Sequence, residues 1–232
     1  MDKNKIKVQA FLSKITLFNA LRAHELDRIA LGATELHAER GTVIVRRGDA
    51  CAGLHVVLYG RVKLSFIATG GAEKVMELIG PGQSFGEAVM FMESDYLITA
   101  EAMENSMLLH VAKSVIFREI HDDPGFARKM LAGMSARMQA LMCDLESLTL
   151  RTGTQRVAAY LLKDMPRDSG DAAMRTLTLT LPVAKAVVAS RLNLTPEHFS
   201  RIMADFRTRK MIAVRGREVS ILDNSALRRY AG

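Results

Sequence analysis

Residues 33–112 carry six short β-rich runs, and closely spaced turn signals separate them. The turn signals are glycines, including the Gly70-Gly71 pair between two alternating runs and the Gly80-Pro81-Gly82 triplet. Many short strands divided by such turns are typical of a sandwich or barrel, and Gly70-Gly71 predicts a hairpin. The runs read VIVRR, LHVVLYG, RVKLSFIA, KVMELIG, LITAEAM and SMLLHVA.

Helical patterns flank this β-rich segment. Residues 15–31 have apolar side chains at helical spacing. On the other side, Asp122 or Asp123 is expected to cap a long helix that has Pro124 in its first turn. After Gly153 we expect a helix over 154–165, a polar loop over 166–175 and a strand over 176–181.

The long helix carries a narrow apolar stripe with alternating steps of three and four residues, over about three heptads. Such a stripe is typical of the seam of a parallel two-helix coiled coil, and is narrower than a core-facing stripe usually is. The alternative is a face packed on the helix's own domain. We expect the dimer seam, formed by Leu131, Met134, Met138, Leu141, Leu145 and Leu148.

The excess positive charge lies in the last third of the chain. Residues 150–232 contain 15 Lys and Arg against 7 Asp and Glu, a net charge of +8. The whole chain has a net charge of +7, so the preceding residues sum to −1. A basic module on a neutral body predicts a polyanion partner, although a well-solvated basic domain has the same composition.

Residues 182–206 predict a helix-turn-helix. A first helix ends before Asn193, which tolerates a left-handed turn, and Thr195 and Pro196 are start signals for a second helix. The second helix buries one stripe and presents Glu197, Ser200 and Arg201 on its polar side. These side chains suit base edges in the major groove, the alternative being a surface ion pair and a solvated hydroxyl. The buried stripe consists of Phe199, Ile202, Met203 and Phe206.

Two β-runs follow and flank an Arg-Gly-Arg tip at residues 215–217, which predicts a wing. Basic residues around the helix-turn-helix and wing are candidates for contacts to DNA phosphates, which position a protein and make its binding salt-dependent. These candidates are Lys185, Arg191, Arg209, Arg215 and Arg217.

The order of β-roll, long helix and winged helix resembles the cyclic-AMP receptor protein/fumarate-nitrate regulator (CRP/FNR) family over nearly the whole chain. PEHFSR at 196–201 is similar to the E-x-x-S-R recognition signature of the FNR side. FGEAVMFMESDYLITAEA and VAKAVVASRLNLTPEHFSRIM look closest to the Dnr-type branch, which is associated with haem and nitric-oxide sensing.

The resemblance implies an α+β fold: a cyclic-nucleotide-binding-type β-roll (jelly roll) over 1–121, a dimerisation helix over 122–150 and a winged helix-turn-helix over 151–232. It implies a dimeric transcription regulator, not an enzyme, whose effector binds in the roll. Glu197, Ser200 and Arg201 would read a TTGAT-like half-site of an inverted repeat in double-stranded DNA, and RNA polymerase would be a further partner.

The resemblance places the effector near Phe85-Gly86-Glu87 and the long helix, yet cyclic AMP is not the expected ligand. Where nucleotide-binding relatives carry an Arg for the cyclic phosphate, this chain has residues 97–99, Leu-Ile-Thr. Between Lys74 and Lys113 there are six acidic residues and no Lys or Arg. A buried phosphate needs a paired cation. The expected pocket residues are Gly86, Glu87, Leu97, Ile98, Leu141 and Met142.

The apolar character of Leu97, Ile98, Leu141 and Met142, together with the resemblance, favours a hydrophobic or haem-type effector. An iron–sulfur cluster is excluded because the two cysteines, Cys51 and Cys143, do not supply its N-terminal cysteine group. Two alternatives remain: a metal-dependent β-roll enzyme and a sensor that does not bind DNA. The first would need clustered His and carboxylate ligands, whereas the histidines are isolated along the sequence, so we expect no metal site.

The sequence contains no run of about 18 apolar residues, so we expect no membrane span. The N-terminal segment has no continuous apolar stretch, which argues against a signal peptide. Together with two free thiols, this predicts a cytoplasmic protein.

Overall fold

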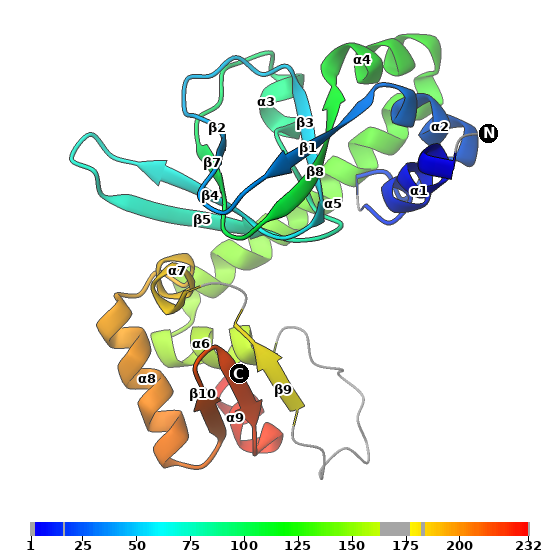
Figure 1. The fold of residues 1–232 in the computed structure, drawn as a ribbon. Helices are drawn as coiled ribbons and strands as arrows, with labels where there is room; N and C mark the ends of the chain where they lie inside the picture. Colours follow the sequence, from blue (N-terminus) through cyan, green and yellow to red (C-terminus); the bar gives the residue numbers. More distant parts are fainter. Residues whose placement is uncertain (1–2, 16, 163–176, 182–183, 232) are drawn as a thin grey trace. The chain divides into compact units, whose positions relative to one another are not determined.

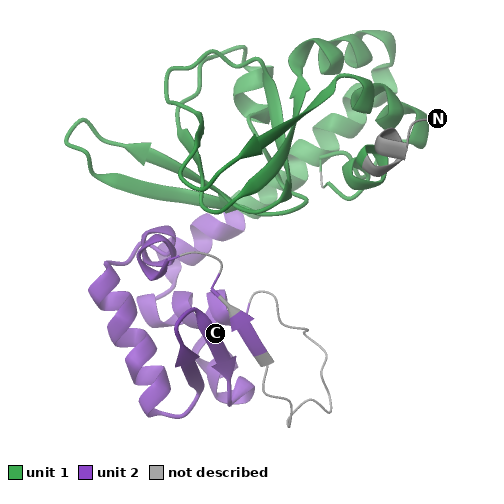
Figure 2. Cartoon of the chain, viewed as in Figure 1, with its two compact units in different colours: residues 1–141 green, residues 142–232 purple. Residues whose placement is uncertain are grey.

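The computed structural model describes residues 3–15, 17–162, 177–181 and 184–231, and it divides into two compact units, 1–141 and 142–232 (Figures 1 and 2). The expected loop over 166–175 lies outside the described residues. The unit boundary falls within one continuous helix, α5 (Pro124–Leu150). The domain boundaries expected at 121/122 and 150/151 stay predictions.

Unit 1 is built around two four-stranded antiparallel sheets, with strand orders β1-β8-β3-β6 and β2-β7-β4-β5 (Figure 1). Inward side chains of both sheets form one core, which includes Val57, Val62, Ile79, Phe85 and Leu108. The strands are β1 (Ala33–Ala38), β2 (Val43–Val45), β3 (Gly53–Tyr59), β4 (Val62–Ile67), β5 (Glu73–Ile79), β6 (Ser84–Phe85), β7 (Thr99–Ala102) and β8 (Ser106–Ala112).

The six expected runs all form strands, and the glycine-punctuated pattern therefore identified the roll correctly. The hairpin at Gly70-Gly71 is confirmed between β4 and β5: Gly71 has φ +81°, and the Ala68 N–H donates to the Ala72 carbonyl over 2.9 Å. The sequence analysis missed β1 and β6, as well as α3 (Glu87–Phe91) and α4 (Lys113–Asp122).

The N-terminal helix expected over 15–31 is only partly correct. Residues 17–20 form turns, helix α2 covers Ala23–Leu31, and a further helix, α1 (Lys3–Leu12), precedes them. Leu17 and Leu21 are both buried, but Leu17 lies in the turn and Leu21 in the irregular segment that precedes α2. Helix α5 comes so close to that turn that a Cβ on Gly133 would lie 2.8 Å from the Leu17 carbonyl oxygen. Tertiary packing has thus overridden the local helical periodicity.

Helix α5 begins as the sequence predicts. The Asp123 carboxylate accepts a hydrogen bond from the Gly125 N–H over 2.8 Å, and Pro124 is the first helical residue. The N-terminal half of the helix buries Phe126, Met130 and Gly133 against the roll and the N-terminal helices.

Unit 2 contains a three-stranded antiparallel sheet of order β10-β11-β9 and the helices α6 to α9. The helix expected over 154–165 is described up to Leu162, and the final helix α9 was not predicted. The elements are α6 (Gly153–Leu162), β9 (Leu177–Thr180), α7 (Lys185–Arg191), α8 (Pro196–Thr208), β10 (Ile212–Arg215), β11 (Glu218–Ile221) and α9 (Asn224–Ala231). Among the described helices, none is both long and apolar enough to span a membrane.

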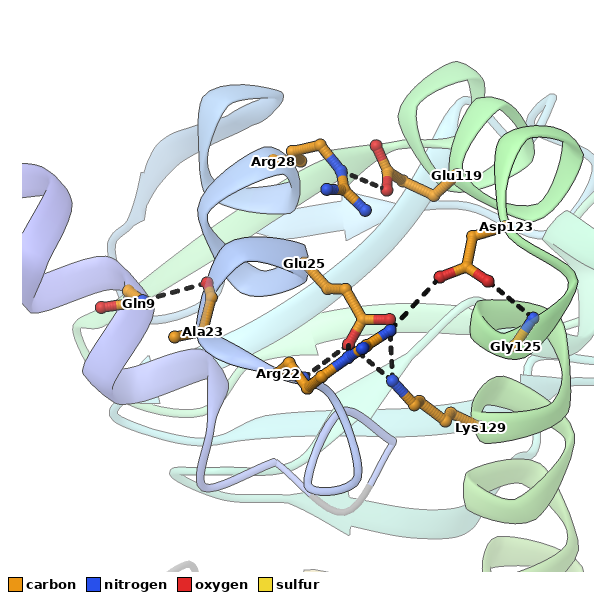
Figure 3. A network of polar contacts seen from close by, with 9 residues as sticks. All are labelled: Gln9, Arg22, Ala23, Glu25, Arg28, Glu119, Asp123, Gly125 and Lys129. Atoms are coloured by element: carbon orange, nitrogen blue, oxygen red, sulfur yellow. Dashed lines mark hydrogen bonds and ion pairs between the residues drawn. The ribbon is translucent and has the colours of Figure 1, made fainter.

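An ionic network joins α2 to α4 and α5 in unit 1 (Figure 3). The fully buried carboxylate of Glu25 accepts hydrogen bonds from the Lys129 ammonium over 2.7 and 2.8 Å and from the Arg22 N–H over 2.5 Å. Nearby, Arg28 of α2 pairs with Glu119 of α4 over 2.6 Å. Burial alone would raise the pKa of Glu25, but the bonds from Lys129 and Arg22 outweigh it and lower the pKa to about 2.

We predict that Glu25→Gln lowers the free energy of unfolding at pH 7 by about 3 kcal/mol, because it leaves Lys129 without its carboxylate. The folded pKa is depressed, so the stabilisation is complete above the ordinary glutamate pKa of 4.5 and is lost as pH falls toward about 2. Urea unfolding of both proteins from pH 7 to pH 2 measures this difference. Glu39→Gln, at an exposed position, is the control. A difference that stays constant across this range would contradict the assignment.

Candidate nucleic-acid interface and effector pocket

One face of helix α8 is buried in unit 2 and the opposite face is exposed to solvent. Its apolar stripe is buried as expected, with Phe199 and Phe206 fully buried and Ile202 and Met203 at most 6% exposed. The turn before it has the predicted chemistry: Asn193 has φ +55°, and the Thr195 hydroxyl caps the helix by accepting a hydrogen bond from the His198 N–H over 3.2 Å. The predicted helix-turn-helix is therefore present as α7, turn and α8.

The three expected base-reading residues, Glu197, Ser200 and Arg201, are all exposed on α8. Between the described side chains of Glu197 and Arg201 there is no ion pair within 4 Å, so the surface-pair alternative is absent from this structure. Hydrogen bonds from the backbone N–H of Glu197 and from the Thr195 hydroxyl lower the pKa of Glu197. Glu197 is therefore an ionised acceptor at neutral pH, and Arg201 is a donor one turn further along.

The five phosphate candidates fall into two groups. Lys185 and the wing residues Arg215 and Arg217 are exposed, and Gly216 at the wing tip has φ +60°. The expected wing is confirmed as the hairpin of β10 and β11.

The other two candidates are engaged within the protein. Arg191 pairs with Asp144 of α5, and its side chain is only 16% exposed. Arg209 bonds to Asp205 over 3.0 Å and to the Tyr230 hydroxyl over 2.8 Å. Arg191 thus ties α7 to the C-terminal part of α5, and Arg209 ties α8 to α9. The sequence could not reveal the contacts with Asp144 and Tyr230, which lie 47 and 21 residues away, whereas Asp205 and Arg209 are four residues apart on one helix.

The six expected effector residues lie on separate elements. Gly86 caps α3 with φ +95°, and a Cβ there would lie 2.9 Å from the Tyr96 hydroxyl. Glu87 follows it, while Leu97 and Ile98 precede β7. Leu97, Leu141 and Met142 are 61, 48 and 64% exposed. A depression of about 460 Å³ lies elsewhere, beside α2 and α4, where it is lined by Arg28, Arg118 and Glu119 among others.

Acidic groups and paired cations characterise the roll near Glu87. Burial raises the pKa of Glu87, and a hydrogen bond with Ser84 opposes this effect. Arg137 of α5 pairs with Glu77 of β5. Lys63 lies on the opposite face of β4 from the core residues Val62 and Leu64; it is 6% exposed and bonds to Glu73 over 2.7 Å and to Glu101 over 3.2 Å. Both Arg137 and Lys63 therefore have carboxylate partners.

The sheet brings together two histidines that are isolated in the sequence. His55 of β3 is directly opposite His110 of β8, and their ring centroids are 5.0 Å apart. Burial lowers the pKa of both, that of His55 to about 3, so both imidazoles are neutral at pH 7. Within the described residues no group of three or more His, Cys, Asp or Glu is placed to hold a metal ion.

Comparison with known proteins identifies both parts of the chain. The cyclic nucleotide-binding domain family matches residues 35–123, and the Crp-like helix-turn-helix domain family matches residues 155–230. The nitrogen fixation regulation protein FixK of Azorhizobium caulinodans is 30% identical over 202 residues, which cover 86% of this chain and 79% of FixK.

Solved structures agree over the full length. A Ruegeria pomeroyi protein named for cyclic nucleotide binding is 29% identical, with a TM-score of 0.71, and the match covers 100% of this chain and 99% of that one. DNR from Pseudomonas aeruginosa is 30% identical, with a TM-score of 0.56, and the match covers 99% of this chain and 100% of DNR.

FixK and DNR match at equal identity, so the expected closeness to the Dnr-type branch is not singled out. The relatives are transcription regulators and not enzymes, in agreement with the sequence analysis. With its cyclic nucleotide-binding-type sheet domain, long helix and Crp-like helix-turn-helix, the chain belongs to the CRP/FNR family of transcription regulators.

Proposed function

We propose that this chain is a homodimeric regulator that reads an inverted repeat of TTGAT-like half-sites with helix α8. The observation that carries the proposal is the division of α8 into a buried apolar face and an exposed N-terminal face with Glu197, Ser200 and Arg201. A recognition helix contacts base edges with the residues near its N-terminus. Its cap and its buried stripe hold those residues in a fixed orientation.

Each of the three side chains has a suitable partner in the major groove. The Arg201 guanidinium matches the paired O6 and N7 acceptors of guanine, the Glu197 carboxylate accepts from cytosine N4, and the Ser200 hydroxyl serves either role. The lowered pKa of Glu197 keeps it an acceptor at neutral pH. A DNA-non-binding sensor would have no use for this exposed set on a basic unit.

The exposed cations Lys185, Arg215 and Arg217 are the proposed contacts to phosphates. We assign Arg191 and Arg209 a positioning role, because Asp144 holds the first and Asp205 and Tyr230 hold the second. If these arginines bound DNA phosphates instead, the loss of their internal pairs would offset part of the binding free energy gained.

Homodimerisation is proposed through α5. Leu131, Met138, Leu141 and Leu145 are 48 to 67% exposed, although each is large and apolar. They occupy the heptad positions expected to face a second copy, where burial would stabilise association. Met134 instead packs partly against the core of its own unit, and Leu148 is half-buried.

The proposed effector acts from the β-roll and is not cyclic AMP. Arg137, which acts electrostatically on Glu87, is paired with Glu77, and residues 97–99 contain no Arg. An incoming phosphate would meet buried acidic groups and no free cation among these residues. An apolar or haem-type ligand is proposed from the apolar character of Leu97, Leu141 and Met142 in the sequence, although these residues lie exposed on separate elements. We place the protein in the cytoplasm, with RNA polymerase as its further partner.

We predict that Arg201→Ala removes about 1–3 kcal/mol of discrimination at one guanine of each half-site. Gel-shift affinities for the TTGAT-type duplex and for guanine-substituted duplexes measure this loss. The control is Arg215→Ala, which should weaken binding to all duplexes alike and lower the slope of log affinity against log salt by about one. An unchanged base preference in Arg201→Ala would show that α8 is not the reading element.

We expect Leu141→Lys to give monomers with reduced operator affinity, because the substitution would bury unpaired charges in the α5 seam. Sedimentation equilibrium measures the association state. Leu150→Lys is the matched control, since Leu150 is 78% exposed on the same helix but outside the heptad stripe. If Leu141→Lys remains as dimeric as Leu150→Lys, α5 is not the interface.

Cyclic AMP is expected to produce no binding heat in calorimetry with the purified protein and no change in operator affinity. The physical reason is the lack of an unpaired cation for its phosphate among the residues named above. Micromolar binding would contradict the effector proposal while leaving the DNA-reading proposal intact.

A further inference from the structure

We propose that His55 and His110 form a binding site for a divalent first-row transition-metal ion in the β-roll. The site lies outside the DNA-reading surface, and the inference does not depend on the proposed function. The sequence analysis expected no metal site because the histidines are separated along the sequence, and the proposal departs from that expectation.

The first argument is the placement of the two rings. His55 and His110 are directly opposite each other on the antiparallel strands β3 and β8, so both side chains project from the same face of the sheet. Their centroids are 5.0 Å apart and their planes are inclined by 53°. Metal–nitrogen bonds of about 2.0–2.1 Å bring two imidazoles on one ion to a separation of this order.

The second argument is an unpaired buried nitrogen. His55 is 7% exposed, and its Nδ1 has no hydrogen-bond partner among the described residues. The Phe85 ring stacks on His55 with centroids 4.9 Å apart and planes inclined by 11°, so the imidazole is held in place. Leaving such a group unsatisfied is costly, and a bound ion would supply the missing partner.

The third argument concerns access to His110. Its ring packs so closely on the Gly53 backbone that a Cβ on Gly53 would lie 2.9 Å from His110 Nε2, so only glycine fits there. His110 is only half-buried, which leaves an approach from solvent that His55 lacks.

The donor set defines the class of ion. Neutral imidazole nitrogens suit zinc, copper, nickel and iron better than calcium or magnesium. Because the described residues supply no third ligand, water or a small exogenous molecule would complete the coordination.

Cobalt(II) is the spectroscopic probe for this site and zinc(II) is the competitor. We expect the wild-type chain to bind one Co²⁺, with a visible d–d band that Zn²⁺ removes, and to unfold at a higher temperature when Zn²⁺ is present. His110→Gln should weaken Co²⁺ binding at least about tenfold and abolish the zinc-dependent shift. His37→Gln, at an exposed position of β1 in the same sheet, should change neither.

Absence of Co²⁺ binding to the wild type would overturn the proposal, as would equal losses in His110→Gln and His37→Gln. If His110→Gln does not fold, X-ray absorption of the zinc-loaded wild type decides. Scattering from two imidazoles supports the site, and scattering without imidazole overturns it.

Discussion

Burial of the apolar stripe of α8 fixes the direction in which its polar side chains point. Phe199, Ile202, Met203 and Phe206 pack into unit 2, so the residues on the opposite side of the helix face solvent. The tight turn at Asn193 and the cap at Thr195 set the residue at which the helix begins. They therefore determine which residues occupy its exposed N-terminal turn.

The two units differ in how their positively charged side chains are placed. In unit 1, buried or half-buried cations such as Lys63, Lys129 and Arg137 are matched by carboxylates. In unit 2, Lys185, Arg201, Arg215 and Arg217 are exposed on a segment with a net charge of +8. The pairing of Arg137 with Glu77 opposes the binding of an anionic effector beside Glu87, whereas exposed cations in the winged helix attract a polyanion.

Local signals predicted much of this architecture. Glycine turns located the strands of the roll, and the capping residues Asp123 and Thr195 located the starts of α5 and α8. Periodicity identified the buried face of α8, and with it the candidate reading residues. It failed at residues 17–20, where a turn buries Leu17 close to Gly133 of a helix from a distant part of the chain.

Features that depend on long-range pairing were not predictable from one sequence. His55 and His110 meet only because β3 and β8 adopt one particular register, and Arg191 is restrained only because α7 lies beside Asp144. The sequence likewise marked Leu97, Ile98, Leu141 and Met142 as pocket candidates by their apolar character. In the structure these residues lie on separate elements, and three of the four side chains are exposed. Apolar character alone does not determine which residues pack together.

The central claim is that two copies of α8 read successive major grooves of one duplex. Its most direct test is operator affinity measured as a function of the spacing between half-sites. A two-fold dimer places its recognition helices about one helical turn, ~34 Å, apart. Affinity should therefore fall steeply when about five base pairs, half a helical turn, are inserted between the half-sites. Affinity that is indifferent to this spacing would contradict the account.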